Sequence, residues 1–158
     1  MNPFNLLDAA VPSDPHSARP EGFRRNELQL GSLLGASRMG ATLYEIPPGE
    51  RLGPYHYEHN NEEWLLVVVG RPTLRTPQGE RELRAGDVVV FPEGPEGAHA
   101  TSNRTGEPVR VVMLSTKRKP AVAVYPDSDK IAIWRIDDDG IIVKRADATD
   151  YWDGEARP

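Results

Sequence analysis

Cysteine is absent from this chain of 158 residues. Its absence excludes disulfide bonds, thiolate metal ligands and cysteine nucleophiles, and is compatible with a reducing cytosol. No apolar run approaches the roughly 18 to 20 residues of a membrane span, and no signal peptide is recognisable at the N-terminus. The sequence also lacks a GxSxG serine, a Walker loop and a dinucleotide fingerprint. We expect a soluble, cytoplasmic protein that uses neither a hydrolase nucleophile nor a nucleotide.

A large excess of charge of one sign is also missing. Lys and Arg number 19 against 24 Asp and Glu, so the net charge is −5, and no long run of either sign occurs. This balance predicts no nucleic-acid partner and no anionic membrane surface. A small-molecule ligand or substrate is the expected partner. The length and the 38% of hydrophobic residues fit one domain with a single core.

Helical periodicity is scarce, and short apolar or alternating segments follow one another from Leu28 onward. The 14 glycines and 15 prolines of the chain punctuate these segments densely. This spacing is typical of an all-β sandwich or barrel. The segment "LQLGSLLG" is predicted as a strand. The stretches "TPQGE" and "NRTGEP" are each predicted to be a turn that joins two neighbouring antiparallel strands.

Residues 1–22 differ from the rest because they carry four prolines and only a short apolar patch, at Phe4, Leu6 and Leu7. Such a segment cannot fold alone. We expect an extended N-terminal arm that docks on the domain or on a partner subunit of a homodimer, followed by a single domain over residues 23–158. His16 lies in the arm and is not expected to bind metal.

The first of two motifs is "GERLGPYHYEHNNEEWLLVVVG". It resembles the first cupin motif, G-x(5)-H-x-H-x(3,4)-E-x(6)-G. His56 takes the first histidine position, and six residues separate Glu63 from Gly70 as the motif requires. Glu58 stands at the second histidine position, and Gly49 is one residue too far from His56.

The second motif is "GDVVVFPEGPEGAHATSN", which resembles G-x(5)-P-x-G-x(2)-H-x(3)-N. Five residues separate Gly86 from Pro92, and three separate His99 from Asn103. The segment "EGPEGA" between Pro92 and His99 is longer than in the motif, and the gap of 15 residues over 71–85 is in the style of the family. The resemblance implies the double-stranded β-helix, or jelly-roll barrel, of a small cupin domain.

The strand periodicity groups the candidate ligands. Side chains alternate along an extended strand, so His56 and Glu58 share one face and His59 takes the other. His59 could replace Glu58 only if a bulge shifted the strand by one residue. Glu63 begins a strand in which both faces are predicted to be buried, where a carboxylate is costly unless it is paired or bound to a cation. His99 comes from another strand. Among the tyrosines, Tyr44 is the expected lining residue of the pocket.

We therefore predict a divalent transition metal held by His56, Glu58, Glu63 and His99. Two imidazoles and two carboxylates suit Fe(II), Mn(II), Zn(II) or Ni(II) and leave positions open for water or substrate. Imidazoles bind metal only when neutral, so the metal should be lost below about pH 6, with the carboxylates resisting to lower pH.

Two classes of function fit such a centre. One is a metal-dependent enzyme that acts on a small oxygen-bearing molecule by dioxygenation, isomerisation or decarboxylation. The other is a module that binds or senses a small molecule without turnover. Since the cupin fold hosts many unrelated activities, the resemblance does not choose between them.

Overall fold

The computed structural model describes residues 3–13, 19–134 and 140–155, and it is built almost entirely from β-strands. The helical elements are one α-helical turn, α1 (Leu30–Leu33), and three 3₁₀ turns, η1 (Pro95–Gly97), η2 (Pro126–Ser128) and η3 (Arg145–Asp147). The strands are β1 (Asn26–Leu28), β2 (Met39–Ile46), β3 (Tyr57–Glu58), β4 (Glu63–Val69), β5 (Thr73–Thr76), β6 (Gly79–Glu82), β7 (Val88–Phe91), β8 (Ala100–Ser102), β9 (Val109–Thr116), β10 (Ala121–Tyr125), β11 (Lys130–Trp134) and β12 (Ile141–Lys144).

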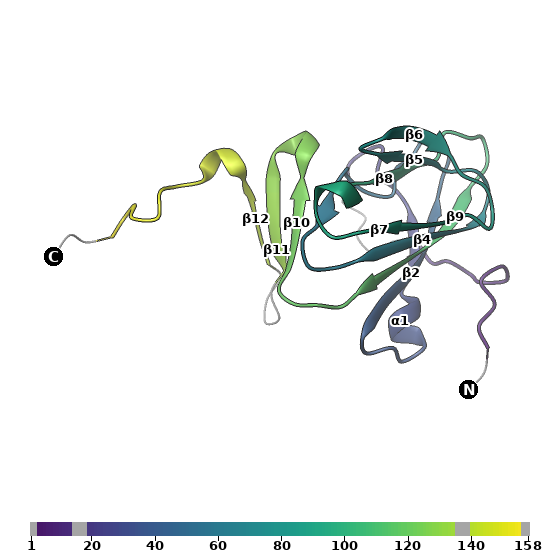
Figure 1. Ribbon diagram of the computed structural model, residues 1–158. Coiled ribbons are helices and arrows are strands. Elements are labelled where there is room, and N and C mark those ends of the chain that lie inside the picture. Colours follow the sequence, from purple (N-terminus) through teal and green to yellow (C-terminus); the bar gives the residue numbers. More distant parts are fainter. Residues whose placement is uncertain (1–2, 14–18, 135–139, 156–158) are drawn as a thin grey trace.

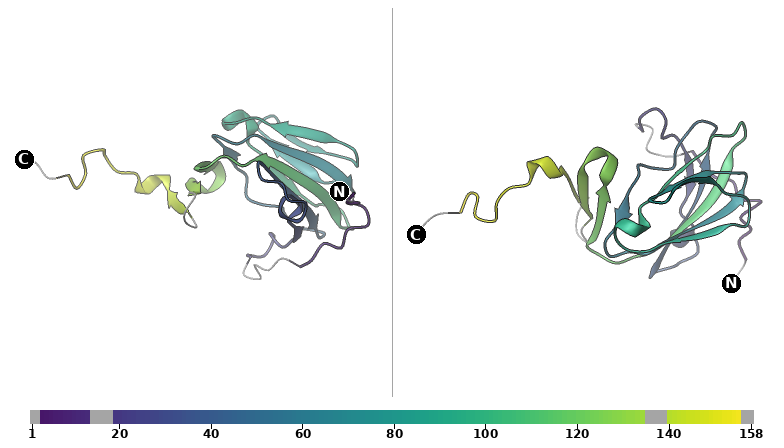
Figure 2. Two further views of the ribbon diagram at one scale, coloured as in Figure 1. Left: turned by 90° about the horizontal axis from the view of Figure 1, so that it is seen from below. Right: turned by 45° about the horizontal axis from the view of Figure 1, so that its top comes forward.

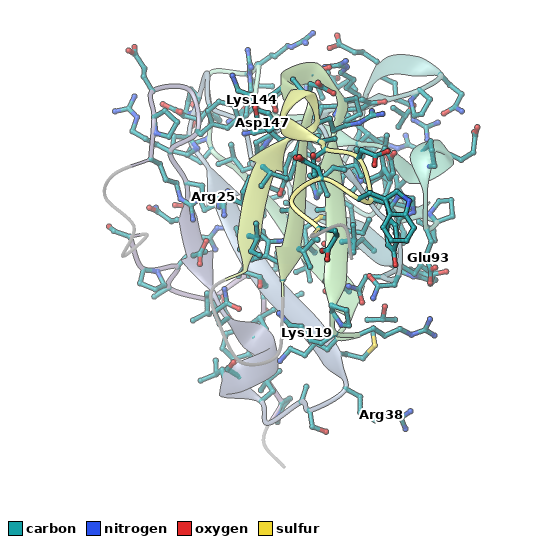
Figure 3. All side chains as sticks on the ribbon, turned by 90° about the vertical axis from the view of Figure 1, so that its left-hand side faces the viewer. Arg25, Arg38, Glu93, Lys119, Lys144 and Asp147 are labelled. Carbon is teal, nitrogen blue, oxygen red and sulfur yellow. The ribbon has the colours of Figure 1, made fainter. Side chains whose placement is uncertain are left out.

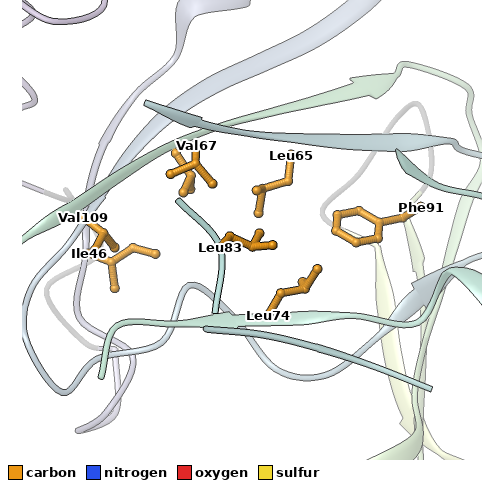
Figure 4. Packing of buried hydrophobic residues seen from close by; sticks show 8 residues of the cluster. Ile46, Leu65, Val67, Leu74, Leu83, Phe91 and Val109 are labelled. Atoms are coloured by element: carbon orange, nitrogen blue, oxygen red, sulfur yellow. The ribbon is translucent and has the colours of Figure 1, made fainter. Parts of the chain in front are cut away.

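Two antiparallel sheets form the barrel (Figure 1). The larger has the strand order β1-β2-β9-β4-β7, and the smaller has the order β6-β5-β8. The core lies between them (Figure 4) and consists of Ile46, Leu65, Val67, Leu74, Leu83, Phe91, Val109 and Val111. The predicted all-β jelly-roll architecture is therefore confirmed.

A third sheet, with the order β12-β11-β10-β3, lies beside the barrel (Figure 2). Its attachment to the barrel is β3, since Tyr57 and Glu58 pair with Val124 and Ala123 of β10. Figure 3 looks onto this C-terminal sheet, with Lys144 labelled at the end of β12. The sheet thus joins the segment that carries His56 to the C-terminal part of the chain.

Strand β4 shows the predicted alternation on one face only. Leu65 and Val67 are buried in the core, and Glu63 lies on the same face. On the outer face Trp64 is 39% exposed, so the prediction that both faces are buried is wrong at this residue. The antiparallel sheet has one face on the core, and its other face is covered only in part.

The N-terminal segment supplies part of that cover. Phe4, Leu6, Ala9 and Val11 pack in a second hydrophobic cluster with residues of β2, β4 and β9. The apolar part of the arm is therefore docked on its own domain, although Leu7 is exposed. His16 lies outside the described residues, and the division into an arm and a domain at residue 22 stays a prediction.

Two local predictions are corrected. The segment "LQLGSLLG" is not one strand: β1 ends at Leu28, and the helical turn α1 follows. Gly31 packs tightly on β2 there, because a Cβ atom added to it would lie 3.2 Å from the backbone nitrogen of Ala41. The turn "TPQGE" does join antiparallel neighbours, β5 and β6.

The turn "NRTGEP" does not join a hairpin. Strand β8 pairs with β5 in the small sheet, and β9 pairs with β2 and β4 in the large one. Buried Asn103 stabilises this crossing between sheets, since its Nδ2 donates to the carbonyl oxygens of Ile46 and Glu107 at 2.9 and 2.8 Å. A turn sequence specifies a local reversal of the chain but not which strand each arm will pair with.

No helix in the described part of the chain has the length and apolar character needed to cross a membrane.

Truncating a side chain on the inner face of the β4–β7 pair should lower the free energy of unfolding more than truncating one on the outer face. Replacing fully buried Leu65 with Ala should lower the free energy of unfolding by about 2–5 kcal/mol, because a cavity would remain between the sheets. Replacing Val88, which is 55% exposed on β7, with Ala should lower the free energy of unfolding by less than about 1 kcal/mol. Urea unfolding of the metal-free variants measures both, and equal losses would contradict the assignment of the core.

Candidate metal centre

Three side chains from separate segments meet at one end of the barrel. Glu63 is the first residue of β4, while His56 and His99 immediately precede the short strands β3 and β8. His56 and His99 lie directly opposite each other and exchange two backbone hydrogen bonds, of 3.1 and 2.8 Å. In an antiparallel pair, residues so placed carry their side chains on the same face. The pairing therefore brings together two imidazoles that lie 43 positions apart in the sequence.

Glu63 faces both rings. Its Oε2 lies 3.7 Å from Nε2 of His56 and 3.7 Å from Nε2 of His99. These separations are too long for hydrogen bonds. The three potential ligand atoms lie within 4.8 Å of one another, so the three residues form a group that could hold a metal ion. The three ligand atoms therefore converge on one point.

The backbone selects the tautomer of each histidine. Nδ1 of His56 lies 2.9 Å from the carbonyl oxygen of Pro54, and Nδ1 of His99 lies 2.9 Å from that of Gly97. Since a carbonyl oxygen only accepts, each Nδ1 carries the proton and donates it. Both Nε2 atoms are left with a lone pair directed toward Glu63. This is the form in which imidazole binds metal, with its other nitrogen held by a hydrogen bond.

Burial controls the charge of the three groups. Desolvation raises the pKa of Glu63 to about 8, and the charge of Glu58 adds to this rise. Desolvation lowers the pKa of His99 to about 3, with a further contribution from His56, and it also lowers the pKa of His56. Without a cation the centre is therefore neutral at pH 7. Two aligned lone pairs and a carboxyl fit a divalent metal, whose charge would favour the ionised carboxylate.

Glu58 lies near the three residues but outside the group that they form. Its Oε2 accepts a hydrogen bond of 2.8 Å from Nδ2 of Asn61, which is buried. Its charge nevertheless raises the pKa of Glu63, so the two carboxyls are close enough to interact. The fourth-ligand role of Glu58 stays a prediction. His59 lies on the other side of the strand, with its ring 5.3 Å from that of Tyr57.

A cavity of about 410 Å³ opens onto the three residues. As predicted, Tyr44 lines it, whereas Tyr55 lines a neighbouring cavity and stacks with the guanidinium of Arg75 at 4.0 Å. Other lining residues could not be found from the sequence, because no motif marks them: Arg19, Arg25, Leu52, Thr101, Met113, Tyr125 and Trp134. Tyr125 and Trp134 come from β10 and β11, so the C-terminal sheet closes one side of the cavity.

Whether Glu58 or His59 faces the metal can be tested directly by substitution. His59→Ala should leave the metal content unchanged, since its ring faces Tyr57. Glu58→Ala should weaken metal binding, either as a lost ligand or through the lost negative charge beside Glu63. Metal analysis of both variants, purified without a metal-binding tag, measures the difference. Loss of metal only in His59→Ala would contradict the register of β3 and would support a bulged strand.

The pH dependence of metal binding should follow Glu63. Its raised pKa of about 8 means that the metal-free carboxyl is protonated at pH 7, whereas His99, with a pKa of about 3, stays neutral well below pH 6 and burial also lowers the pKa of His56. This reverses the order expected from unperturbed pKa values. Binding should release about one proton per metal at pH 7 and almost none above pH 9, and affinity should fall roughly tenfold per pH unit below 8. Calorimetry in buffers of different ionisation enthalpy measures the proton count, and zero release at pH 7 would contradict the prediction.

Comparison with known proteins agrees with this geometry. Residues 42–115, which include His56, Glu63 and His99, match the family described as the cupin domain. These residues therefore form a small cupin domain, in agreement with the fold. No curated protein matches its sequence.

Solved structures extend the likeness to nearly the whole chain. A candidate sugar phosphate isomerase from Acidithiobacillus ferrooxidans is 27% identical, with a TM-score of 0.80 over 92% of this chain and 91% of that one. A sugar phosphate isomerase of the cupin superfamily from Silicibacter pomeroyi is 25% identical, with a TM-score of 0.78 over 96% and 98% of the two chains. The polyketide cyclase RemF from Streptomyces resistomycificus is 22% identical, with a TM-score of 0.59 over 77% and 83%, and it shares the fold alone.

Proposed function

We propose that this protein is a metal-dependent isomerase of a phosphorylated sugar. The observation that carries the proposal is the group formed by His56, Glu63 and His99, placed in a cavity of about 410 Å³. A cavity of this size suits a small metabolite. The likeness to two proteins named for sugar phosphate isomerisation, over more than nine-tenths of each chain, supports this substrate class.

The metal is proposed to be a divalent transition ion, Fe(II), Mn(II), Zn(II) or Ni(II). A divalent ion here would act as a Lewis acid on the oxygens of the substrate. His56 and His99 would hold it through Nε2 and Glu63 through Oε2, because these are the atoms that face one another. Glu58 is the proposed fourth ligand. If it is not a ligand, it is the carboxylate placed to move a proton, held by its hydrogen bond from Asn61.

The remaining residues of the cavity suit a sugar phosphate. Burial raises the pKa values of Tyr44 and Tyr125, so both phenols stay protonated at neutral pH and can donate hydrogen bonds to sugar oxygens. Arg25, held over the ring of Tyr44 at 4.9 Å and paired with Glu27 at 3.3 Å, brings a guanidinium group to the cavity. A guanidinium is well matched to a phosphate group.

Isomerisation of an aldose phosphate to a ketose phosphate moves hydrogen between neighbouring carbons and is redox-neutral overall. The test is to incubate the metal-loaded protein with pentose and hexose phosphates in D₂O. Proton NMR would show exchange at the carbon next to the carbonyl and formation of the isomer. A His99→Ala preparation made in parallel controls for contaminating isomerases. With full metal occupancy, binding without formation of the isomer would favour the non-catalytic alternative, and no binding would contradict the proposal.

We also propose that the protein is a cytoplasmic homodimer. The dimer is supported by strand β12 at the edge of the C-terminal sheet, where Ile141, Ile142 and Val143 are exposed. An apolar edge strand is a site at which two chains readily pair. Sedimentation velocity over a range of concentrations tests this, and a monomeric mass throughout would contradict it.

A further inference from the structure

Thr101 has an unusual side chain for its position in the molecule. It is only 2% exposed, and its Oγ1 is the one buried side-chain polar atom without a hydrogen-bond partner in the part of the chain that the structure describes. Buried polar groups in native proteins nearly always have a partner. A hydroxyl left without one destabilises the fold, and valine would fill the same space without that cost. The hydroxyl therefore calls for a reason beyond packing.

The position of Thr101 on β8 supplies a reason for the buried hydroxyl. Thr101 follows His99 by two residues along the same extended segment, so both side chains point to the same face, roughly 6–7 Å apart. Across the small sheet it lies opposite Leu74, which is fully buried in the core, so this face is the inner one. Thr101 also lines the cavity that contains His56, Glu63 and His99.

We propose that Thr101 binds a hydroxyl group of the substrate while another substrate oxygen occupies the metal centre. The inference deepens the proposed isomerase function and rests on it. In the ligand-free protein the threonine hydroxyl lacks a partner within the protein, and the substrate would supply one. Binding would thus gain a hydrogen bond without breaking one inside the protein.

The spacing restricts the class of ligand. One oxygen of the ligand would lie at the histidines and another beside Thr101, two residues farther along β8. A chain of four or more carbons with several hydroxyl groups spans such a distance, whereas a two-carbon acid does not. The spacing therefore favours a polyol chain over a compact carboxylate.

The test compares Thr101→Val, which removes the hydroxyl at nearly constant shape, with Thr101→Ser, which keeps it. Thr76→Val is the matched control, because Thr76 is half-buried at the end of β5, does not line the cavity, and has a hydroxyl that already donates to the carbonyl oxygen of Gly79 at 3.3 Å. The probe is sorbitol 6-phosphate, a polyol phosphate without a carbonyl group, so that calorimetry of the metal-loaded proteins measures binding without turnover. Thermal unfolding and metal content of each variant are measured alongside.

We expect Thr101→Val to keep its metal and to unfold at the same or a higher temperature, yet to bind the probe about tenfold more weakly. Thr101→Ser and Thr76→Val should stay within about twofold of the original chain. Unchanged affinity in Thr101→Val, or a loss of its stability or folding, would overturn the role of Thr101 and leave the isomerase proposal standing. If the original chain bound neither sorbitol 6-phosphate nor any pentose or hexose phosphate, both proposals would fail together.

Discussion

Replacing His99 with alanine is expected to abolish stoichiometric metal binding. The imidazole is 3% exposed, its Nδ1 donates to the carbonyl oxygen of Gly97, and its Nε2 faces Glu63 at 3.7 Å. Its removal takes away a metal ligand that the backbone holds in one orientation. Because loss of a group that merely orients a ligand costs 10- to 100-fold in affinity, loss of the ligand itself should cost more than about 100-fold.

Metal content after dialysis, followed by titration with Mn(II) or Zn(II), measures this effect. His59→Ala is the control, since it also removes an imidazole but from the opposite side of β3. The double variant His56→Ala, His99→Ala should be empty of metal. If it carried as much metal as the original chain, the proposed centre would be ruled out.

A second large effect is expected from Gly97→Ala, although this residue binds nothing through a side chain. A Cβ atom added to Gly97 would lie 1.8 Å from the carbonyl oxygen of Pro92, so the loop over residues 92–98 would have to move. The carbonyl oxygen of Gly97 is the group that orients His99. We expect metal affinity to fall by about 10- to 100-fold and the free energy of unfolding to fall as well.

Glu96→Ala is the matched control, because Glu96 is an exposed residue of the same 3₁₀ turn η1. It should keep both affinity and stability close to the original values. Metal titration and urea unfolding of the two variants separate the effect on His99 from the effect on the fold. Unchanged metal affinity in a folded Gly97→Ala variant would show that the turn does not position the histidine.

The same turn accounts for the departure of the second motif from the family pattern. The extra residues of "EGPEGA" form η1, which begins after Gly94, a glycine with a φ of 86° in the left-handed region. Glycine adopts such a φ without strain. The insertion therefore leaves His99 opposite His56, because the turn absorbs the added length before the strand begins.

Much of the fold follows from local sequence patterns. Alternation along "EWLLVVV" placed Glu63 on the same face as Leu65 and Val67, and the structure confirms this. Two-residue periodicity is a property of any extended strand, so a single sequence reveals it. For the same reason the opposed directions of Glu58 and His59 could be predicted, and the contact of His59 with Tyr57 agrees with them.

The features that the sequence could not reveal depend on long-range pairing and burial. The direct pairing of His56 with His99, the crossing at "NRTGEP", and the contribution of Tyr125 and Trp134 to the cavity all depend on which strands become neighbours. The raised pKa of Glu63 and the lowered pKa of His99 require desolvation by residues distant in sequence. The sequence by itself determined most of the strands and identified the candidate ligands. The tertiary structure decided their distances and their protonation, because both depend on contacts that no local pattern encodes.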